Sequence, residues 1–117
     1  MTEGVRFERE GSIAVITVDR PNTKNAIDRG AMRALERIVE SIEEDEDVST
    51  VIVTGSGDHF ISGGDIKDLS EITSAEEGRR VAHWMQTIIN RLDALPCPTI
   101  AAIDGDARHR HALAFKL

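Results

Sequence analysis

The sequence predicts an α/β fold in which buried parallel strands alternate with amphipathic helices. Short β-branched aliphatic runs alternate along the chain with longer segments whose apolar residues recur at helical spacing. The order strand, helix, strand is typical of a βαβ unit, in which the two strands run parallel. The chain has 117 residues, which is enough for one domain of this class or for part of a larger one.

The N-terminal residues are predicted to form a β-hairpin. Residues 5–8 and 12–18 are rich in β-branched and aliphatic side chains, and Gly11 between them supplies a turn. Pro21 then ends the extended pattern because it donates no backbone hydrogen bond, and we expect a loop from there to about Ile27.

An amphipathic helix is predicted to start after Asp28, whose carboxylate can cap the first turn. Apolar residues at helical spacing follow it: Ala31, Leu35, Ile38 and Ile42. The helix is expected to end in the acidic run 43–47, because like charges at the negative end of a helix dipole are unfavourable. Residues 48–54 form the next strand, and its continuous apolar run 51–53 predicts that both faces of this strand are covered.

A second helix and a third strand are predicted in the C-terminal half. Residues 66–69 form one or two helical turns, and Ser74 begins a capping box for a longer helix. The apolar positions of this longer helix are Val81, Trp84, Ile88 and Leu92. The helix stops before Pro96, and the apolar run 99–103 is the third buried strand.

Two successive glycines, Gly63 and Gly64, lie between the strand at 48–54 and the short helix at 66–69. Glycines allow a ligand to approach the main chain closely, and the N–H groups of a helix that follows would point at the same place. Such a loop can bind an anion or stabilise a developing oxyanion. An ordinary strand-to-helix turn accounts for the same residues, and the sequence leaves both interpretations open.

Composition and charge exclude several classes of function. A net charge of -7 argues against nucleic acid as a partner, because phosphate binding requires a basic surface. No uncharged run is long enough to cross a membrane, so no membrane partner is expected. The single cysteine, Cys97, excludes an intrachain disulfide, and no export signal is visible at the N-terminus. We therefore expect a cytoplasmic protein.

The last residues, 108–117, differ in composition from residues 1–107. Their charged side chains are all basic, namely Arg108, Arg110 and Lys116. We interpret 1–107 as the domain portion and 108–117 as a divergent basic tail, which an altered reading frame would explain. His109 and His111 alternate in this tail, but two imidazoles are too few for a metal site, and no metal is expected.

Several motifs follow one another in a characteristic order. They are Arg20-Pro21, Asn25-Ala26, Thr54-Gly55, the run Phe60-x-Ser62-Gly63-Gly64-Asp65-Ile66-Lys67, and the run from Pro98 to Gly105. In this order they closely resemble the N-terminal part of the crotonase family, the enoyl-CoA hydratase and isomerase superfamily. The resemblance covers nearly all of residues 5–107. It implies a crotonase-like ββα spiral, of which this chain would be a truncated N-terminal portion, and assembly into homo-oligomers, either trimers or hexamers.

The resemblance also implies a ligand and a site. The ligand is an acyl-CoA thioester, which acts as the substrate, so no separate cofactor is implied. Gly64 would donate a backbone N–H to the thioester oxygen, and the loop residues along bound CoA would be Gly63, Gly64, Asp65, Ile66 and Lys67. An enolate oxygen forms when water adds to an enoyl thioester or when its double bond shifts, and one preorganised donor stabilises it by about 3 kcal/mol.

The chain departs from the family pattern after Gly105. The second oxyanion donor of the family comes from a glycine triplet, whereas this chain has His109, Arg110 and His111 there, with Arg110 at the donor position. The glutamate that serves hydratases as an acid/base group falls on Leu113, which cannot transfer a proton. Two hypotheses follow. The chain is an enoyl-CoA hydratase or isomerase, or it is a non-catalytic family member that binds acyl-CoA or a protein partner.

Overall fold

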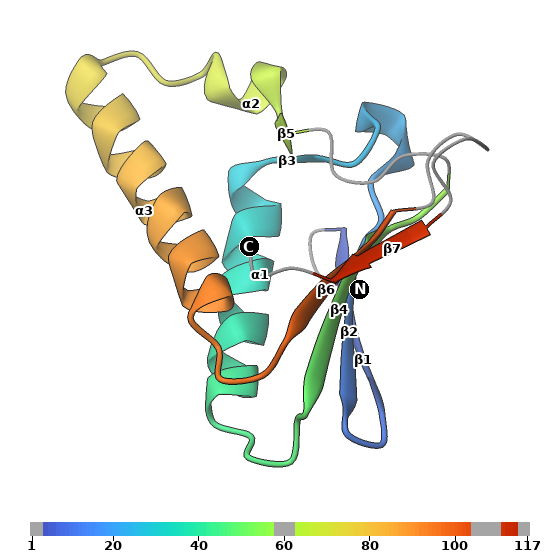
Figure 1. Cartoon of the computed structure of the whole chain (residues 1–117). Coiled ribbons are helices and arrows are strands. Elements are labelled where there is room, and N and C mark those ends of the chain that lie inside the picture. The colour runs from blue at the N-terminus through green and yellow to red at the C-terminus, as the bar shows by residue number, and fades with distance from the viewer. Residues whose placement is uncertain (1–3, 58–62, 104–110, 115–117) are drawn as a thin grey trace.

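The computed structural model describes residues 4–57, 63–103 and 111–114, and it consists of a sheet with two long helices on one face (Figure 1). In chain order the elements are β1 (Val5–Glu10), β2 (Ile13–Val18), the 3-10 helix η1 (Pro21–Thr23), β3 (Ala26–Ile27), α1 (Arg29–Glu43), β4 (Thr50–Gly55), β5 (Gly63–Gly64), α2 (Ile66–Leu69), α3 (Ala75–Asp93), β6 (Thr99–Ile103) and β7 (His111–Ala114). Five strands form the main sheet in the order β1-β2-β4-β6-β7, and β3 pairs with β5 in a second, two-stranded sheet.

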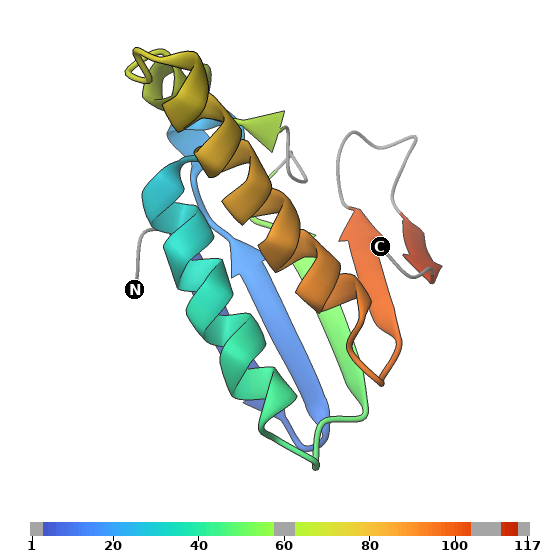
Figure 2. The same cartoon turned by 90° about the vertical axis from the view of Figure 1, so that its left-hand side faces the viewer.

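The main sheet contains the predicted hairpin and the predicted parallel unit. β1 and β2 are antiparallel, with Val5 opposite Val18, and Gly11 in the turn between them has a positive φ of 60°. β2, β4 and β6 are parallel neighbours. The helix α1 lies between β2 and β4 in the chain and α3 lies between β4 and β6, and both pack on the same face of the sheet (Figure 2). The prediction of a βαβ arrangement is confirmed.

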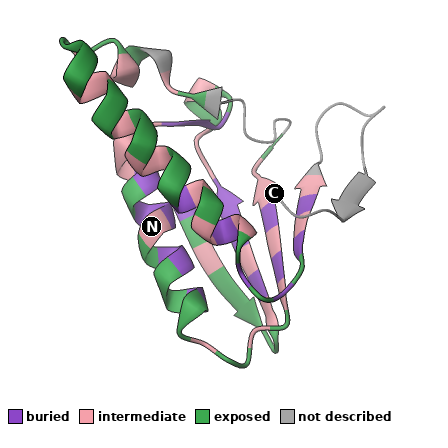
Figure 3. Cartoon of the chain, turned by 60° about the vertical axis from the view of Figure 1, so that its left-hand side comes forward, coloured by how far each residue is buried: buried purple, intermediate pink, exposed green. Residues whose placement is uncertain are grey.

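The hydrophobic core lies between this face of the sheet and the helices. The helix α1 begins as predicted, because the Asp28 carboxylate accepts a hydrogen bond of 2.7 Å from the N–H of Ala31. The buried residues of α1 are Ala31, Met32, Ala34, Leu35, Ile38, Val39 and Ile42. They form one cluster with inward side chains of the strands, among which Ile16 and Val51 are fully buried. Figure 3 shows the buried stripe along α1 beside the sheet.

The opposite face of the main sheet is less covered than the sequence predicts. Val15, Ile52 and Ile100 form one row across β2, β4 and β6, and each is only partly buried. In β4, Val51 and Val53 point to the helices and are buried, whereas Ile52 between them points to the opposite face. The continuous apolar run predicts cover on both faces, but in the described part of the chain the helices lie on one face only (Figures 1 and 2).

The helix α3 docks on the core through its C-terminal half. Ser74 caps it as the capping-box pattern predicts, with its hydroxyl accepting a hydrogen bond of 3.1 Å from an N–H of the first turn. Ile88 and Leu92 are buried, whereas Trp84 is partly buried against the same core. The guanidinium carbon of Arg33 on α1 lies 5.8 Å from the centre of the Trp84 ring, which is a cation–π distance.

The sequence patterns miss three short strands. β3 and β5 lie in segments that the sequence assigns to loops, and each has only 2 residues. β7 lies in the segment that the sequence assigns to a divergent tail, and it pairs antiparallel with β6, with His111 opposite Ile103. Residues 111–114 therefore belong to the main sheet. The strand was missed because four residues beside a basic cluster carry too short a pattern to indicate a strand.

Candidate functional site

The glycine pair lies in β5, which is held against β3. Ala26 is opposite Gly63 and Ile27 is opposite Gly64 in this parallel pair. The N–H of Asp65, the next residue, donates a hydrogen bond of 3.0 Å to the carbonyl oxygen of Ile27. The segment predicted as a loop up to Ile27 therefore ends in a short strand that positions the glycines.

The hydrogen bond of Asp65 defines the direction of the Gly64 amide. Successive N–H groups of an extended strand point to opposite edges of that strand. Since the Asp65 N–H faces β3, the Gly64 N–H faces the other edge of β5, and Gly64 is exposed. The Gly64 N–H is therefore not used in the pairing of β3 with β5.

Gly64 also packs closely against α2. A Cβ atom added to Gly64 would lie 3.0 Å from Cδ1 of Leu69, which is closer than an ordinary carbon contact. A larger residue would have to displace the Leu69 side chain. Packing against Leu69 thus also favours glycine at this position, so the residue type alone does not distinguish a binding loop from an ordinary turn.

Asp65 caps the single turn of α2. Its Oδ1 accepts hydrogen bonds from the N–H groups of Lys67, at 3.0 Å, and Asp68, at 3.3 Å. The expectation that the N–H groups of this helix point at a ligand is wrong for these two residues, because the Asp65 carboxylate occupies them. The contacts implied between CoA and the backbone of residues 63–67 remain predictions.

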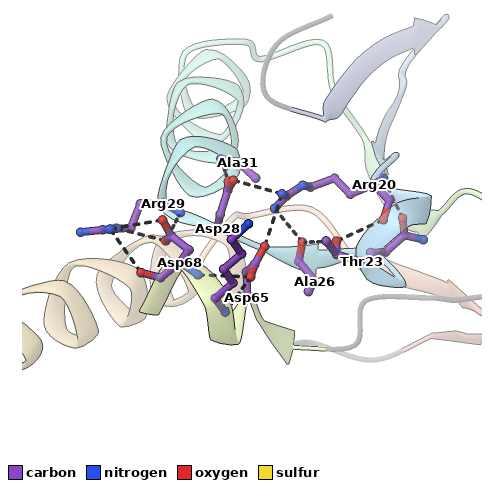
Figure 4. Close-up of polar contacts among 10 residues, drawn as sticks. Arg20, Thr23, Ala26, Asp28, Arg29, Ala31, Asp65 and Asp68 are labelled. Atoms are coloured by element: carbon purple, nitrogen blue, oxygen red, sulfur yellow. Dashed lines mark hydrogen bonds and ion pairs between the residues drawn. The ribbon is translucent and has the colours of Figure 1, made fainter. Parts of the chain in front are cut away.

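Arg20 connects the segments that flank the pair of β3 and β5 (Figure 4). Its Nη1 donates a hydrogen bond of 2.9 Å to the carbonyl oxygen of Ala26. Its Nη2 lies 3.1 Å from Oδ2 of Asp28 and 3.5 Å from Oδ2 of Asp65. Because Asp28 caps α1 and Asp65 caps α2, one guanidinium joins the capping carboxylates of both helices.

Asn25 shapes the loop that presents Arg20. It is fully buried and has a left-handed φ of 62°, which asparagine tolerates better than most residues. Its Oδ1 accepts a hydrogen bond of 2.8 Å from the backbone N–H of Arg20, and its Nδ2 donates one of 2.9 Å to the carbonyl oxygen of Ser56. The Arg20-Pro21 and Asn25-Ala26 motifs are thus two parts of one hydrogen-bonded loop.

A second arginine, Arg29, holds α2 against the start of α1 (Figure 4). Its Nε and its backbone N–H each donate a hydrogen bond of 3.0 Å to Oδ2 of Asp68. Hydrogen bonding to Arg29 lowers the pKa of Asp68 below its ordinary value, and the same contact raises the pKa of Arg29. Glu71 and Glu77 lie 3.6 and 3.7 Å from the same guanidinium.

Sequence reasoning located the glycines but missed the charged side chains around them. The sequence marks Arg20 only as part of a motif and Asp28 only as a helix cap, and it assigns no role to Arg29. The one local signal is the spacing of Asp65 and Asp68, which places both carboxylates on one helical turn. Nothing local links these aspartates to arginines that lie 45 and 39 residues away.

Some predicted residues lie outside the described part of the chain, namely Phe60, Ser62, His109 and Arg110. In β7, Leu113 is opposite Ala101 on β6. Across residues 4–57, 63–103 and 111–114, no three His, Cys, Asp or Glu side chains are grouped as metal ligands would be. Over the same residues, no helix combines the length and the apolar character needed to cross a bilayer.

Comparison with known sequences identifies relatives of this chain. The sequence model of the family described as enoyl-CoA hydratase/isomerase matches residues 8–109. The chain is 36% identical over 104 residues to the short-chain-enoyl-CoA hydratase of Clostridium acetobutylicum, a match that covers 88% of the chain and 40% of that relative. It is 32% identical over 106 residues to the crotonyl-CoA hydratase of Syntrophomonas wolfei, which covers 90% of the chain and 40% of that relative.

Solved structures share the fold. An enoyl-CoA hydratase from Mycobacterium smegmatis aligns with a TM-score of 0.82 at 26% identity, over 86% of this chain and 39% of that one. An enoyl-CoA hydratase from Bacillus anthracis aligns with a TM-score of 0.80 at 26% identity, over 87% of this chain and 40% of that one. The predicted crotonase-like α/β fold is confirmed, and the chain spans about 40% of the length of the curated relatives it matches.

Proposed function

The chain belongs to the enoyl-CoA hydratase/isomerase family, and from this premise we propose that it binds an acyl-CoA thioester through the backbone N–H of Gly64. In this proposal the N–H donates a hydrogen bond to the thioester oxygen. Two relatives are hydratases of short-chain enoyl-CoA and of crotonyl-CoA. Because the chain spans about 40% of their length, the hydration or isomerisation of an enoyl thioester is itself part of the proposal.

The observation that carries the proposal is the direction of the Gly64 amide. The N–H of Asp65 forms the hydrogen bond to β3, so the N–H of Gly64 lies at the other edge of β5 on an exposed residue. Backbone N–H groups are strong hydrogen-bond donors, and one at an exposed residue can donate to water or to a ligand. A thioester oxygen could take the place of water here without the loss of a strand-pairing hydrogen bond.

The proposed chemistry puts negative charge on the thioester oxygen. When water attacks the β-carbon of an enoyl thioester and gives up a proton, the double bond shifts to lie between the α-carbon and the carbonyl carbon, and negative charge moves to the carbonyl oxygen. Return of a proton to the α-carbon re-forms the carbonyl and completes hydration. A fixed donor at this oxygen stabilises the enolate more than it stabilises the neutral thioester. One donor of this kind contributes a factor of about 100 to 1000 in rate. By resemblance, the second donor position falls on Arg110.

A second candidate function is thioester binding without turnover. Leu113 stands where the resemblance places an acid/base glutamate. A leucine side chain neither accepts nor donates the proton that hydration requires. In this case the chain would bind acyl-CoA through the same Gly64 amide and release it unchanged.

Two substitutions separate the amide of Gly64 from its packing. Gly64→Pro removes the N–H, and it costs no hydrogen bond between β3 and β5 because this N–H points away from β3. Gly64→Ala keeps the N–H and adds the Cβ that approaches Leu69, so it is the matched control. We expect the proline variant to bind crotonyl-CoA at least tenfold more weakly than the alanine variant. Circular dichroism should show that both variants fold.

Isothermal titration calorimetry measures this difference with two ligands. Free CoA lacks the thioester oxygen, so its affinity should be the same for the wild type and both variants. Equal affinities of the proline and alanine variants for crotonyl-CoA would contradict the proposal. Loss of the absorbance of the conjugated enoyl thioester during incubation then separates an enzyme from a binding protein.

We also propose that the chain self-associates, as the family resemblance implies. The partly buried apolar row of Val15, Ile52 and Ile100 on the open face of the sheet supports this proposal, because apolar surface of this kind tends to be covered. Light scattering coupled to size exclusion should give the mass of a trimer or a hexamer. A single monomeric species at all concentrations would contradict it.

A further inference from the structure

We propose that Arg20 is a positioning residue for the Gly64 amide. The claim that Arg20 fixes the Gly64 N–H concerns the chain without ligand. The claim that this affects the thioester oxygen rests on the proposed function. One guanidinium joins Asp28, which caps α1, to Asp65, which caps α2, and to the carbonyl oxygen of Ala26 in β3. One side chain therefore joins the residue that follows the glycine pair to the partner strand β3 and to the start of α1.

The pair of β3 and β5 needs support of this kind. Each strand has 2 residues, and both residues of β5 are glycines. Short isolated strand pairs are not stable in water, and glycine has more backbone freedom to lose than any other residue. The β5 sequence therefore allows many directions for the Gly64 N–H, so contacts from outside the strand must select one.

Each capping carboxylate divides its oxygens between a helix and Arg20. Oδ1 of Asp65 accepts hydrogen bonds from α2, while Oδ2 lies 3.5 Å from Nη2 of Arg20. Oδ1 of Asp28 accepts a hydrogen bond from α1, while Oδ2 lies 3.1 Å from the same nitrogen. Loss of Arg20 would leave both caps in place but would uncouple them from each other.

The cluster of Arg20, Asp28 and Asp65 is sheltered from water, and the main chain that carries its arginine is fixed. Its three charged side chains are between 14% and 28% exposed, whereas those of the surface pair Arg80 and Glu76 are 68% and 76% exposed. Water and salt screen a sheltered ion pair less than an exposed one. The backbone of Arg20 is itself fixed by its hydrogen bond to Asn25. The guanidinium therefore extends from a fixed main chain.

The position of the donor matters because it must be in place before charge develops on the thioester oxygen. A misplacement of about 1 Å at a reacting centre costs about 100-fold in rate. In this proposal Arg20 does not contact the thioester. It acts through Asp65, which follows Gly64 directly and whose N–H holds β5 against β3.

Arg20→Gln tests the inference, and Arg91→Gln is the matched control. Glutamine removes the charge and keeps a polar side chain at both positions. Arg91 forms an ion pair of 2.6 Å with Glu43, which is 48 residues away in the chain. This pair lies at the C-terminal ends of α1 and α3, and Figure 1 shows that these ends are far from β5. Both substitutions thus remove long-range ion pairs of an arginine, because Arg91 also lies 4.0 Å from Glu36. Only Arg20 contacts a residue next to the glycines.

The first measurement uses the chain without ligand. Nuclear magnetic resonance relaxation reports the order of the Gly64 N–H, and hydrogen exchange reports the protection of the Asp65 N–H. We expect Arg20→Gln to move Gly64 from a rigid to a flexible order parameter. Exchange at Asp65 should become at least tenfold faster, while Arg91→Gln changes neither value. Unchanged order at Gly64 and unchanged exchange at Asp65 in a folded Arg20→Gln chain would overturn the inference.

The second measurement connects position to chemistry. The infrared carbonyl stretch of bound crotonyl-CoA reports hydrogen bonding to the thioester oxygen. We expect Arg20→Gln to shift this frequency back toward that of the free thioester, with the affinity for free CoA changed less than twofold. If the wild type itself shows no shift on binding, the proposed function fails, while the result without ligand still decides the structural part.

Asp65→Asn keeps the test decisive if Arg20→Gln does not fold. Asparagine retains an oxygen that can cap α2 but removes the charge that faces Arg20. We expect a folded chain in which Gly64 loses order as it does in Arg20→Gln. Arg20→Lys, which keeps the charge without the planar fork, should give an intermediate effect. Order at Gly64 equal to that of the wild type in both variants would contradict the inference.

Discussion

Arg20 and Asp65 are 45 residues apart in the chain, yet Nη2 of the arginine lies 3.5 Å from Oδ2 of the aspartate. The contact joins the segment after β2 to the start of α2. Asp65 follows Gly64 directly, so changes in the segment after β2 should be measurable at the glycine pair.

Asn25→Asp should destabilise the chain by about 3 kcal/mol. Aspartate keeps the oxygen that accepts from Arg20, but it loses the donor to the Ser56 carbonyl and places a charge in a fully buried position. Urea unfolding measures the difference. Asn22→Asp, at an exposed position of the same loop, is the control and should change stability by less than about 0.5 kcal/mol.

Lys24→Gly should stabilise the chain by about 0.5 to 1 kcal/mol. Lys24 is exposed and has a left-handed φ of 56°, a conformation that strains residues with a Cβ. Glycine removes this strain. Glycine also loses more conformational entropy on folding than lysine does, but the relief of strain is the larger of the two effects. A rise in the midpoint of thermal unfolding is the expected readout. Lys24→Ala keeps the strain, so it should leave the midpoint unchanged; an equal rise with alanine would contradict this explanation.

Asp68→Asn should make the free energy of unfolding less dependent on pH in the acidic range. Arg29 lowers the pKa of Asp68 in the folded chain below its ordinary value of 3.8, so the ionised carboxylate stabilises the fold above that value. This stability is lost as the pH falls through the folded pKa. Urea unfolding between about pH 6 and pH 2 should therefore show a smaller loss for Asp68→Asn than for the wild type.

Glu43→Gln provides the comparison for this pH series. Arg91 lowers the pKa of Glu43 from an ordinary value of 4.5, whereas the ordinary value of Asp68 is 3.8. The stabilisation of the fold by the Glu43 carboxylate should therefore begin to fall at a higher pH than the stabilisation by Asp68. Identical pH profiles for the wild type and Asp68→Asn would show that the contact with Arg29 does not stabilise the fold.

Ile88→Ala should destabilise the chain by about 3 kcal/mol, whereas Ile89→Ala should cost about 1 kcal/mol. The two isoleucines are neighbours on α3, but Ile88 is 1% exposed and Ile89 is only partly buried against the core. The same side-chain atoms are removed in both cases, so helix propensity changes equally. Chemical unfolding of both variants measures the difference, and equal losses would contradict the docking of α3 through Ile88.

Local patterns were sufficient to predict both long helices and the parallel strands. Asp28 and Ser74 cap helices as their positions in the sequence indicate, because a cap requires only a side chain and the N–H groups of the next few residues. The run 99–103 forms β6 for a similar reason, since its apolar pattern is contained within the strand. Signals inside an element can be read from the sequence without knowledge of its neighbours.

Features that depend on distant partners could not be predicted in this way. β3 and β5 are strands only because each is the partner of the other. The glycine pair could be located from its sequence, but the direction of the Gly64 N–H depends on the hydrogen bond between Asp65 and Ile27. The guanidinium of Arg20 meets residues from several segments, and no sequence pattern joins them. The candidate site was therefore found from the sequence without its supporting contacts.

Trp84 is the one tryptophan of a chain that has no tyrosine, and it lies on α3 beneath the guanidinium of Arg33 from α1. Its fluorescence is therefore an intrinsic probe of the contact between the two helices. Circular dichroism, by contrast, follows the backbone of the whole fold. A shift in emission that precedes the loss of ellipticity during denaturation would reveal α3 detaching while the sheet is still intact.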